Sequence, residues 1–67
     1  MRVPEDITTL DAMERWFVER TLEQVGHNKA RAAERLGIDR RTLYRKLEGW
    51  GLTAKYRTAK SREEVRP

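Results

Sequence analysis

The chain has 67 residues, of which 39% are charged and 37% hydrophobic, and its formal net charge at pH 7 is +4. This length allows one small domain, because chains below roughly 70 to 80 residues seldom bury enough apolar surface to be robust alone. The absence of cysteine excludes disulfides and thiolate metal sites, and the single histidine, His27, cannot form a metal cluster by itself. We therefore expect no metal ion and no other cofactor.

The first seven residues carry no recognisable chemistry, and Pro4 keeps the preceding Val3 extended. We interpret residues 1–7 as a linker or an artificial start of the chain. No apolar run approaches the roughly 20 residues that cross a bilayer, and the N-terminus has no hydrophobic signal segment. We expect a soluble, cytoplasmic protein with no membrane partner.

A long amphipathic pattern then predicts a helix from about residue 10 to residue 25. Thr8 and Thr9 are alternative N-caps for it, and Gly26 ends it. Its apolar positions spread over about half of the helix circumference, more than the roughly 100° stripe that a surface helix needs. These positions are Leu10, Met13, Phe17, Val18, Leu22 and Val25. Such a wide face can serve two contacts.

Trp16 lies off this apolar face, near Ala12, Arg20 and Glu23. A large aromatic side chain in that position is either covered by a partner or packed, partly exposed, on its neighbours. Reciprocal contact between two copies of this helix explains both the Trp and the width of the apolar face. We predict a dimer interface at Leu10, Met13, Trp16 and Phe17.

The next segment predicts a short helix from about Lys29 to Leu36. Asn28 can cap its start, and Gly37 tolerates the left-handed backbone at which a helix stops. Ala32 and Ala33 fall on one face, where small side chains let two helices joined by a tight turn approach each other. Ile38 then follows as an apolar residue in the turn.

A second short helix is predicted from about Arg40 to Trp50, with Asp39 as its N-cap. Leu43, Leu47 and Trp50 form its apolar stripe. Off that stripe lie Arg40, Arg41, Tyr44 and Arg45, while Thr42 and Lys46 are placed for phosphates. A helix anchored by one face and basic on the other has the shape and charge to enter a major groove.

The charge of the chain is unevenly distributed. Residues 1–26 carry three basic and six acidic groups, residues 27–52 carry seven and three, and residues 53–67 carry five and two. Basic groups concentrated on the two short predicted helices are typical of a surface that binds a polyanion. We expect electrostatic capture of DNA by Lys29, Arg31, Arg41, Lys46 and the residues after Leu52.

These residues resemble the Fis-type helix-turn-helix of the factor for inversion stimulation, which the C-terminal domains of NtrC-like, sigma-54-dependent activators share. The matching pieces cover about forty residues in the family's order. They are MERWFV at 13–18, Leu22, Asn28, RAAERLGI at 31–38, Arg40, TLYRKL at 42–47 and GL at 51–52. The resemblance implies an all-α domain of three helices with a C-terminal helix-turn-helix, and a homodimer formed through the first helix.

Residue by residue, the resemblance implies that Asn28 and Thr42 touch phosphates, that Arg40 reads a base edge, and that Arg45 contacts the backbone or a base. It gives weaker support to Arg41, Tyr44 and Lys46. Two positions depart from the family pattern. Ala30 stands where Thr or Ser is frequent, and Asp39 where Asn or Ser is common. A carboxylate beside a phosphate is unfavourable, so we interpret Asp39 as structural.

The resulting domain organisation is a Fis-type domain at residues 8–52 followed by a basic, flexible tail at 53–67, in which Tyr56 can pack locally. The chain has no phosphate-binding glycine loop and no receiver-type acidic cluster. We therefore expect an excised or terminal DNA-binding module whose ATPase and sensory domains lie upstream in a parent protein.

Two alternatives remain. A stand-alone, nucleoid-associated protein that bends DNA has a β-hairpin region before the first helix, whereas the MERWFV opening looks more like the activators. A helical protein-interaction module would instead use the Arg-rich helix to bind an acidic partner. An enzyme is not expected, because no catalytic pair or triad of residues converges in the sequence.

Overall fold

The computed structural model describes residues 2–56, which form three helices. These are α1 (Leu10–Gln24), α2 (Lys29–Leu36) and α3 (Arg40–Gly49), and no strand occurs within the described span. The predicted all-α class is confirmed, and α2 has the predicted bounds. The other two helices end one residue earlier than predicted, since Val25 and Trp50 are their C-caps.

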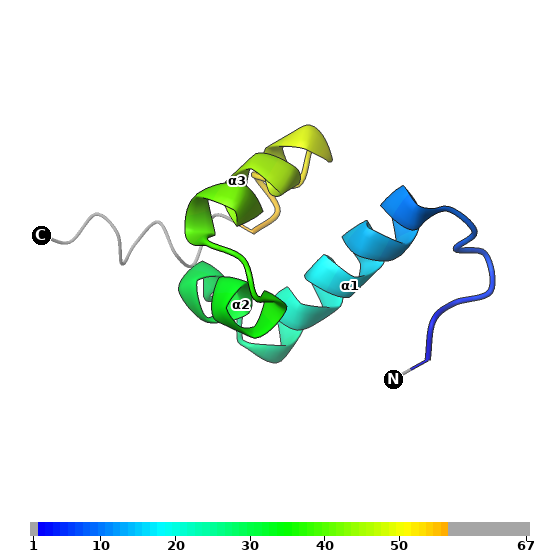
Figure 1. Cartoon of the computed structure of the whole chain (residues 1–67), viewed down its shortest axis with the longest axis horizontal. Helices are drawn as coiled ribbons and strands as arrows, with labels where there is room; N and C mark the ends of the chain where they lie inside the picture. The colour runs from blue at the N-terminus through cyan, green and yellow to red at the C-terminus, as the bar shows by residue number, and fades with distance from the viewer. Residues whose placement is uncertain (1, 57–67) are drawn as a thin grey trace, which may run out of the picture.

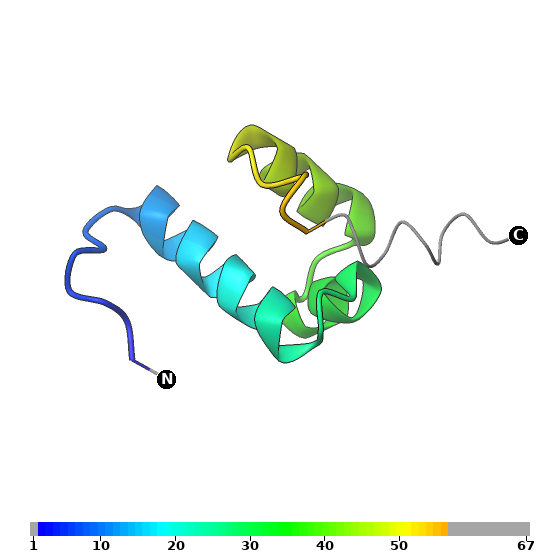
Figure 2. The same cartoon turned by 180° about the vertical axis from the view of Figure 1, so that it is seen from behind.

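The helices are arranged around α2 (Figure 1). Short α2 lies against the C-terminal end of α1, and α3 follows it after a tight turn. The opposite end of α1 projects away from α2, a feature that is equally plain from behind (Figure 2). No helix among residues 2–56 has the length and apolar character needed to span a bilayer.

Short-range hydrogen bonds fix the start of each helix, as predicted. Of the two alternative caps for α1, Thr9 is the one used. Each capping side chain accepts a bond from the backbone N–H three residues later: Thr9 from Ala12 (3.1 Å), Asn28 from Arg31 (3.1 Å) and Asp39 from Thr42 (3.2 Å). At the end of α2, Gly37 has the expected left-handed backbone, with φ of 76°.

The turn between α1 and α2 is less ordinary, because it has two consecutive left-handed residues. Gly26 (φ 64°) adopts this conformation freely, whereas for His27 (φ 67°) it is uncommon. The imidazole of His27 meets the ring of Tyr56 edge-on, with the ring centroids 4.8 Å apart. A tertiary contact thus accompanies the unusual backbone at the point where the chain turns into α2.

The core is small and lies between α2, α3 and the C-terminal half of α1. Its buried apolar members are Val18, Leu22, Ala32, Ala33, Leu43, Leu47, Leu52 and Tyr56. The two alanines of α2 are buried at the helix crossing, as the sequence predicted. Val25, Leu36, Ile38 and Trp50 pack around the margin. In α1 the buried side chains begin only at Val18, so residues 10–17 contribute none.

Tyr56 is fully buried, so the local packing expected for this residue occurs, and the segment from Leu52 to Tyr56 belongs to the folded domain rather than to a flexible tail. Its hydroxyl donates to Glu19 of α1 at 2.7 Å, and its backbone carbonyl accepts from the ammonium group of Lys29 in α2. The domain therefore extends at least to residue 56, because one aromatic side chain closes the core from that side. The remainder of the predicted tail, residues 57–67, lies outside the described residues.

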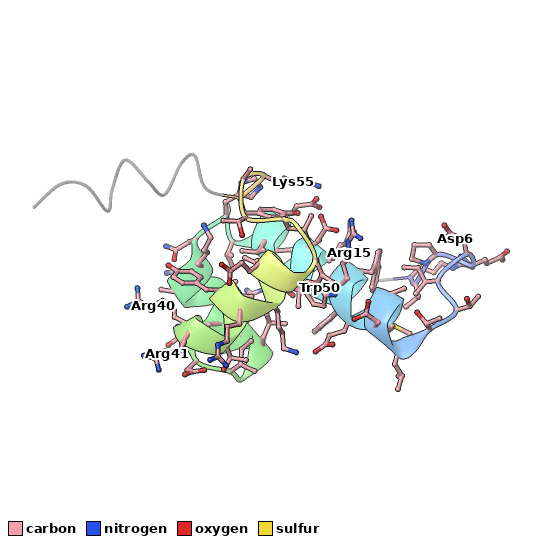
Figure 3. The ribbon with its side chains drawn as sticks, turned by 90° about the horizontal axis from the view of Figure 1, so that it is seen from above. Asp6, Arg15, Arg40, Arg41, Trp50 and Lys55 are labelled. Carbon is pink, nitrogen blue, oxygen red and sulfur yellow. The ribbon has the colours of Figure 1, made fainter. Side chains whose placement is uncertain are left out.

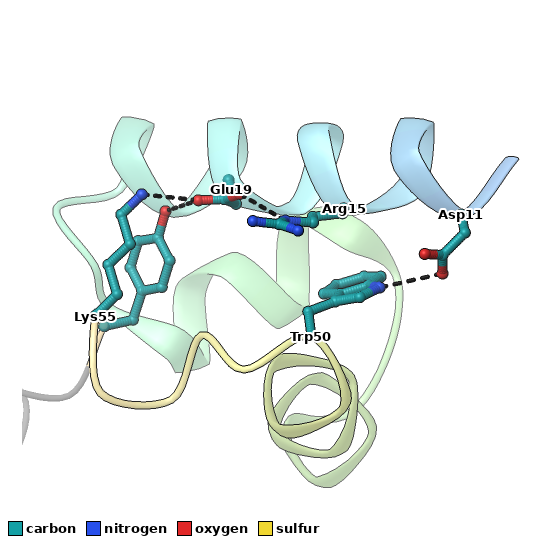
Figure 4. A network of polar contacts seen from close by, with 6 residues as sticks. Asp11, Arg15, Glu19, Trp50 and Lys55 are labelled. Atoms are coloured by element: carbon teal, nitrogen blue, oxygen red, sulfur yellow. Dashed lines mark hydrogen bonds and ion pairs between the residues drawn. The ribbon is translucent and has the colours of Figure 1, made fainter. Parts of the chain in front are cut away.

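Glu19 collects three hydrogen bonds from side chains (Figure 4). Its carboxylate accepts from Tyr56 at 2.7 Å, from Lys55 at 3.0 Å and from Arg15 at 3.2 Å. Burial alone would raise the pKa of Glu19, but these donors, two of them cationic, outweigh it and lower the pKa. Burial and the adjacent Glu19 carboxylate in turn raise the pKa of Tyr56.

We predict that Glu19→Gln lowers the melting temperature at pH 7 and that this effect fades in acid. The folded-state pKa of Glu19 lies below its ordinary value of 4.5. The stabilisation is therefore complete above that value and is lost as the pH falls through the folded-state pKa. Circular-dichroism melting curves between about pH 3 and pH 7 measure this. Glu34→Gln, at an exposed position of α2, is the control. An undiminished difference at the acid end would contradict the prediction.

Candidate nucleic-acid interface

The third helix has one anchored face and one exposed face. Leu43 and Leu47 are buried in the core, and Trp50 packs at its edge. The other side carries the exposed side chains of Arg40, Arg41, Tyr44 and Arg45, as the sequence predicted. Figure 3 shows Arg40 and Arg41 pointing away from α1 and from the N-terminal segment marked by Asp6.

The cations on this face are not neutralised within the described part of the chain. Among residues 2–56, the guanidinium groups of Arg40, Arg41 and Arg45 make no hydrogen bond or salt bridge. Asp39 stands beside them, but its carboxylate is used as the cap of α3. Hydrogen bonds from Thr42, followed by the charge of Arg41, lower the pKa of Asp39. The predicted capping role of Asp39 is confirmed.

The basic character of α3 is confined to its first two turns. Glu48 is exposed and lies one turn beyond Tyr44 and Arg45 on the same side of the helix. A carboxylate there repels phosphate and can accept a hydrogen bond only from a donor such as the amino group of cytosine. The N-terminal half of α3 is therefore the part suited to a polyanion.

Three further predicted contact residues lie around the turn between α2 and α3 or at the start of α2. Arg31 is exposed, whereas Asn28 and Thr42 are half-buried. The side-chain oxygen of Asn28 is used by the cap of α2, which leaves its two amide N–H groups to donate elsewhere. Thr42 uses its backbone N–H for the cap of α3, and its side chain also hydrogen-bonds to the Asp39 carboxylate.

Lys29 was predicted as a cation for electrostatic capture, but its side chain lies inside the domain, with an exposed fraction of 8%. Its ammonium group donates to the backbone carbonyl of Tyr56 and lies 5.9 Å from the centre of the Tyr44 ring. These contacts join α2 to α3 and to the segment after α3 that contains Tyr56. We therefore treat Lys29 as a structural residue beneath the exposed face.

Lys46, predicted as a phosphate contact, lies on the flank of α3 that faces α1. Its ammonium group forms a salt bridge of 2.6 Å with Glu14. One turn further along, the indole N–H of Trp50 donates to Asp11 at 3.1 Å. The sequence analysis missed both carboxylates, because spacing along the chain carries no signal for a contact across 32 or 39 residues.

The four residues of the predicted dimer interface share the N-terminal half of α1. Leu10 is 87% exposed, Phe17 is 44% exposed and Met13 is also exposed. Trp16 is half-buried and lines three surface hollows, one together with Val3, one with Ile7 and one with Arg20. The apolar face of α1 thus divides as its width suggested, with one part in the core and one part uncovered.

Two comparisons identify relatives of this arrangement. The family of bacterial regulatory proteins described as the Fis family matches residues 9–50. The propane 2-monooxygenase operon transcriptional activator MimR of Mycolicibacterium goodii is 48% identical over 46 residues, and its counterpart from Mycolicibacterium smegmatis is 46% identical over 46 residues. Each alignment covers 69% of this chain but 8% of the relative. No solved structure matches the chain.

We predict that Lys29→Met destabilises the fold by about 1 to 3 kcal/mol, because it leaves the buried carbonyl of Tyr56 without its charged donor. Methionine keeps most of the apolar stem, so the loss reports on the ammonium group. Arg31→Met, at an exposed position of the same helix, is the matched control and should change stability by less than about 0.5 kcal/mol. Urea unfolding measures both, and equal effects would refute the structural role of Lys29.

Proposed function

The chain belongs to the Fis family of bacterial regulatory proteins, and we propose that it is the DNA-binding module of a transcriptional activator that reads inverted-repeat sites in the major groove. The observation that carries this proposal is the construction of α3. Leu43 and Leu47 hold one face in the core, while the opposite face presents exposed guanidinium groups in its first two turns that form no salt bridge within residues 2–56. A reading helix needs this combination of rigidity and accessible donors.

In the proposed complex, the N-terminal half of α3 enters the major groove. Arg40 reads a base edge, with guanine as the preferred partner because its two acceptors match the fork of a guanidinium. Arg45 and Tyr44 extend the contact along the groove. Arg31, Arg41, Asn28 and Thr42 bind phosphates and fix the register of the helix. Lys29 takes no direct part, since its ammonium group is held within the domain.

We further propose that the module acts as a homodimer joined through α1. This proposal is supported by the uncovered apolar side chains of Leu10, Met13 and Phe17, which lie on one side of the helix. A second copy bringing the same patch would cover them reciprocally. Two reading helices would then meet one side of the duplex about one helical turn apart, roughly 34 Å, so the binding site would have two-fold symmetry.

The chain spans 8% of the length of the curated relatives it matches. Both relatives are transcriptional activators of the propane 2-monooxygenase operon by name. We propose that this chain belongs to a longer, cytoplasmic activator of the sigma-54-dependent type, whose ATPase and sensory domains lie outside it. The family and the relatives are regulators, so the chemistry of this domain is binding and not catalysis.

We predict that Arg40→Ala weakens binding to the preferred site by about 1 to 3 kcal/mol and relaxes the preference at one base position in each half-site. The preferred site comes from selection of bound duplexes out of a random pool, and fluorescence anisotropy gives the affinities. Arg20→Ala is the matched control, because it removes the same charge from an exposed position on α1. Unchanged affinity and sequence preference in the Arg40 variant would rule out the proposed orientation of α3.

We predict that Phe17→Ala shifts the chain from dimer towards monomer in sedimentation equilibrium, because it removes an aromatic ring from the centre of the proposed interface. Tyr44→Ala is the matched control, since Tyr44 has a similar exposed fraction, 41% against 44%, but lies on the reading face. The dimer dissociation constant of this control should equal that of the unaltered chain. If the unaltered chain were monomeric at high concentration, the dimer proposal would be wrong. Binding to single half-sites could then still be tested.

A further inference from the structure

Residues 10–17 of α1 have no buried side chain, yet two of their carboxylates reach the third helix. Asp11 accepts a hydrogen bond of 3.1 Å from the indole N–H of Trp50, a contact drawn in Figure 4. Glu14 forms the 2.6 Å salt bridge with Lys46. We name these four residues the α1–α3 clasp. It links the half of α1 that lies outside the core to the C-terminal half of α3.

The clasp consists of two parallel contacts between α1 and the end of α3. Asp11 and Glu14 are three residues apart on α1, and Lys46 and the C-cap residue Trp50 are four residues apart at the end of α3, so each pair occupies one side of its helix. The ammonium group of Lys46 also lies 6.0 Å from the centre of the Trp50 ring, which keeps the two donors together. A single contact would let α3 pivot, whereas two contacts one turn apart define its direction.

We propose that Asp11 and Glu14 are positioning residues that set the tilt of α3 against α1 and thereby the spacing between the two half-sites that a dimer accepts. This inference rests on the proposed function, including dimerisation through α1. Leu10, Met13 and Phe17 occupy the same N-terminal half of α1 as the two carboxylates. The clasp therefore ties the reading helix to the segment that would meet the second copy.

The core restrains the other degrees of freedom of α3, and this is why the clasp acts on its tilt. Leu43 and Leu47 fix the position of the helix over α2 and the C-terminal half of α1. The C-terminal end of the helix is held to α1 by Lys46 and Trp50. A small change in tilt at this end alters the direction of Arg41 and Arg45 and, in a dimer, acts twice through the two-fold axis.

Two double variants separate geometry from charge. Asp11→Ala with Glu14→Ala removes both acceptors of the clasp. Asp11→Asn with Glu14→Gln removes the same two negative charges but keeps a carbonyl oxygen at each position to accept from Trp50 and Lys46. Any gain in DNA affinity from lost repulsion is common to both. A difference between the two variants reports the hydrogen bonds of the clasp.

The test measures affinity for the selected site and for two altered sites, in which the half-sites are one base pair closer or one base pair farther apart. We expect the unaltered chain and the Asn/Gln variant to discriminate against both altered sites. In the Ala/Ala variant, the ratio between the affinities for the selected and the altered sites should fall about three- to tenfold, which is the size expected for the loss of two exposed polar contacts. Circular dichroism and sedimentation check that both variants remain folded and dimeric.

Three results would overturn the inference. The Ala/Ala variant could keep the original spacing discrimination, or it could lose affinity equally for all three sites, as a purely structural role predicts. The Asn/Gln variant could lose discrimination to the same extent, which would assign the effect to charge. Failure of the unaltered chain to select any duplex, or selection of single half-sites without a spacing preference, would instead count against the proposed function itself.

Discussion

The burial of Tyr56 is the contact on which the rest of this small domain depends. Its ring is buried in the core, and its hydroxyl donates a hydrogen bond to Glu19 of α1. Its backbone carbonyl accepts a hydrogen bond from the ammonium group of Lys29 in α2. The imidazole of His27 packs on the same ring at the turn between these two helices. Within residues 2–56, Tyr56 is one of four large side chains that are fully buried, with Leu22, Leu43 and Leu47, and its contacts with α1 and α2 hold these two helices together. The placement of α3 depends on this pair, since α3 packs on α2.

Closure by Tyr56 concentrates the core at one end of α1 and leaves the other end free for different contacts. The buried positions of α1 run from Val18 to Leu22, while Leu10, Met13 and Phe17 stay exposed. A globular domain of this size gains little from an additional two turns of helix unless they meet something. The free half carries an apolar patch on one side and the carboxylates of the clasp on another. The proposed association and the proposed positioning of α3 therefore involve the same short segment of helix.

The sequence was sufficient for the features that depend on neighbours along the chain. Asn28, Gly37 and Asp39 act within one helical turn, so their capping roles and the bounds of α2 could be read from spacing alone. The exposed face of α3 was predictable in the same way, from the stripe formed by Leu43 and Leu47.

Contacts between distant positions were not predictable in this way. Lys29 looked like a surface cation because its charge is visible in the sequence, whereas the carbonyl that holds it comes from a residue 27 positions later. Lys46 was assigned to phosphate for the same reason, although its partner Glu14 lies 32 positions earlier. The sequence shows where a charge is, but the fold decides whether another part of the chain already uses it. The charged side chains of the domain accordingly fall into those that are paired within the fold and those that are not. The acidic first helix supplies Glu14 to Lys46 and Glu19 to Lys55, whereas Arg40, Arg41 and Arg45 are left without a salt bridge among residues 2–56. The salt bridge with Glu14 thus offsets the positive charge of Lys46 on the flank of α3 that faces α1. On α3 itself, the exposed arginines without a salt bridge among residues 2–56 lie in the first two turns, and Glu48 follows them at the far end. In the proposed complex, this distribution favours the orientation in which the N-terminal half of α3 meets the groove.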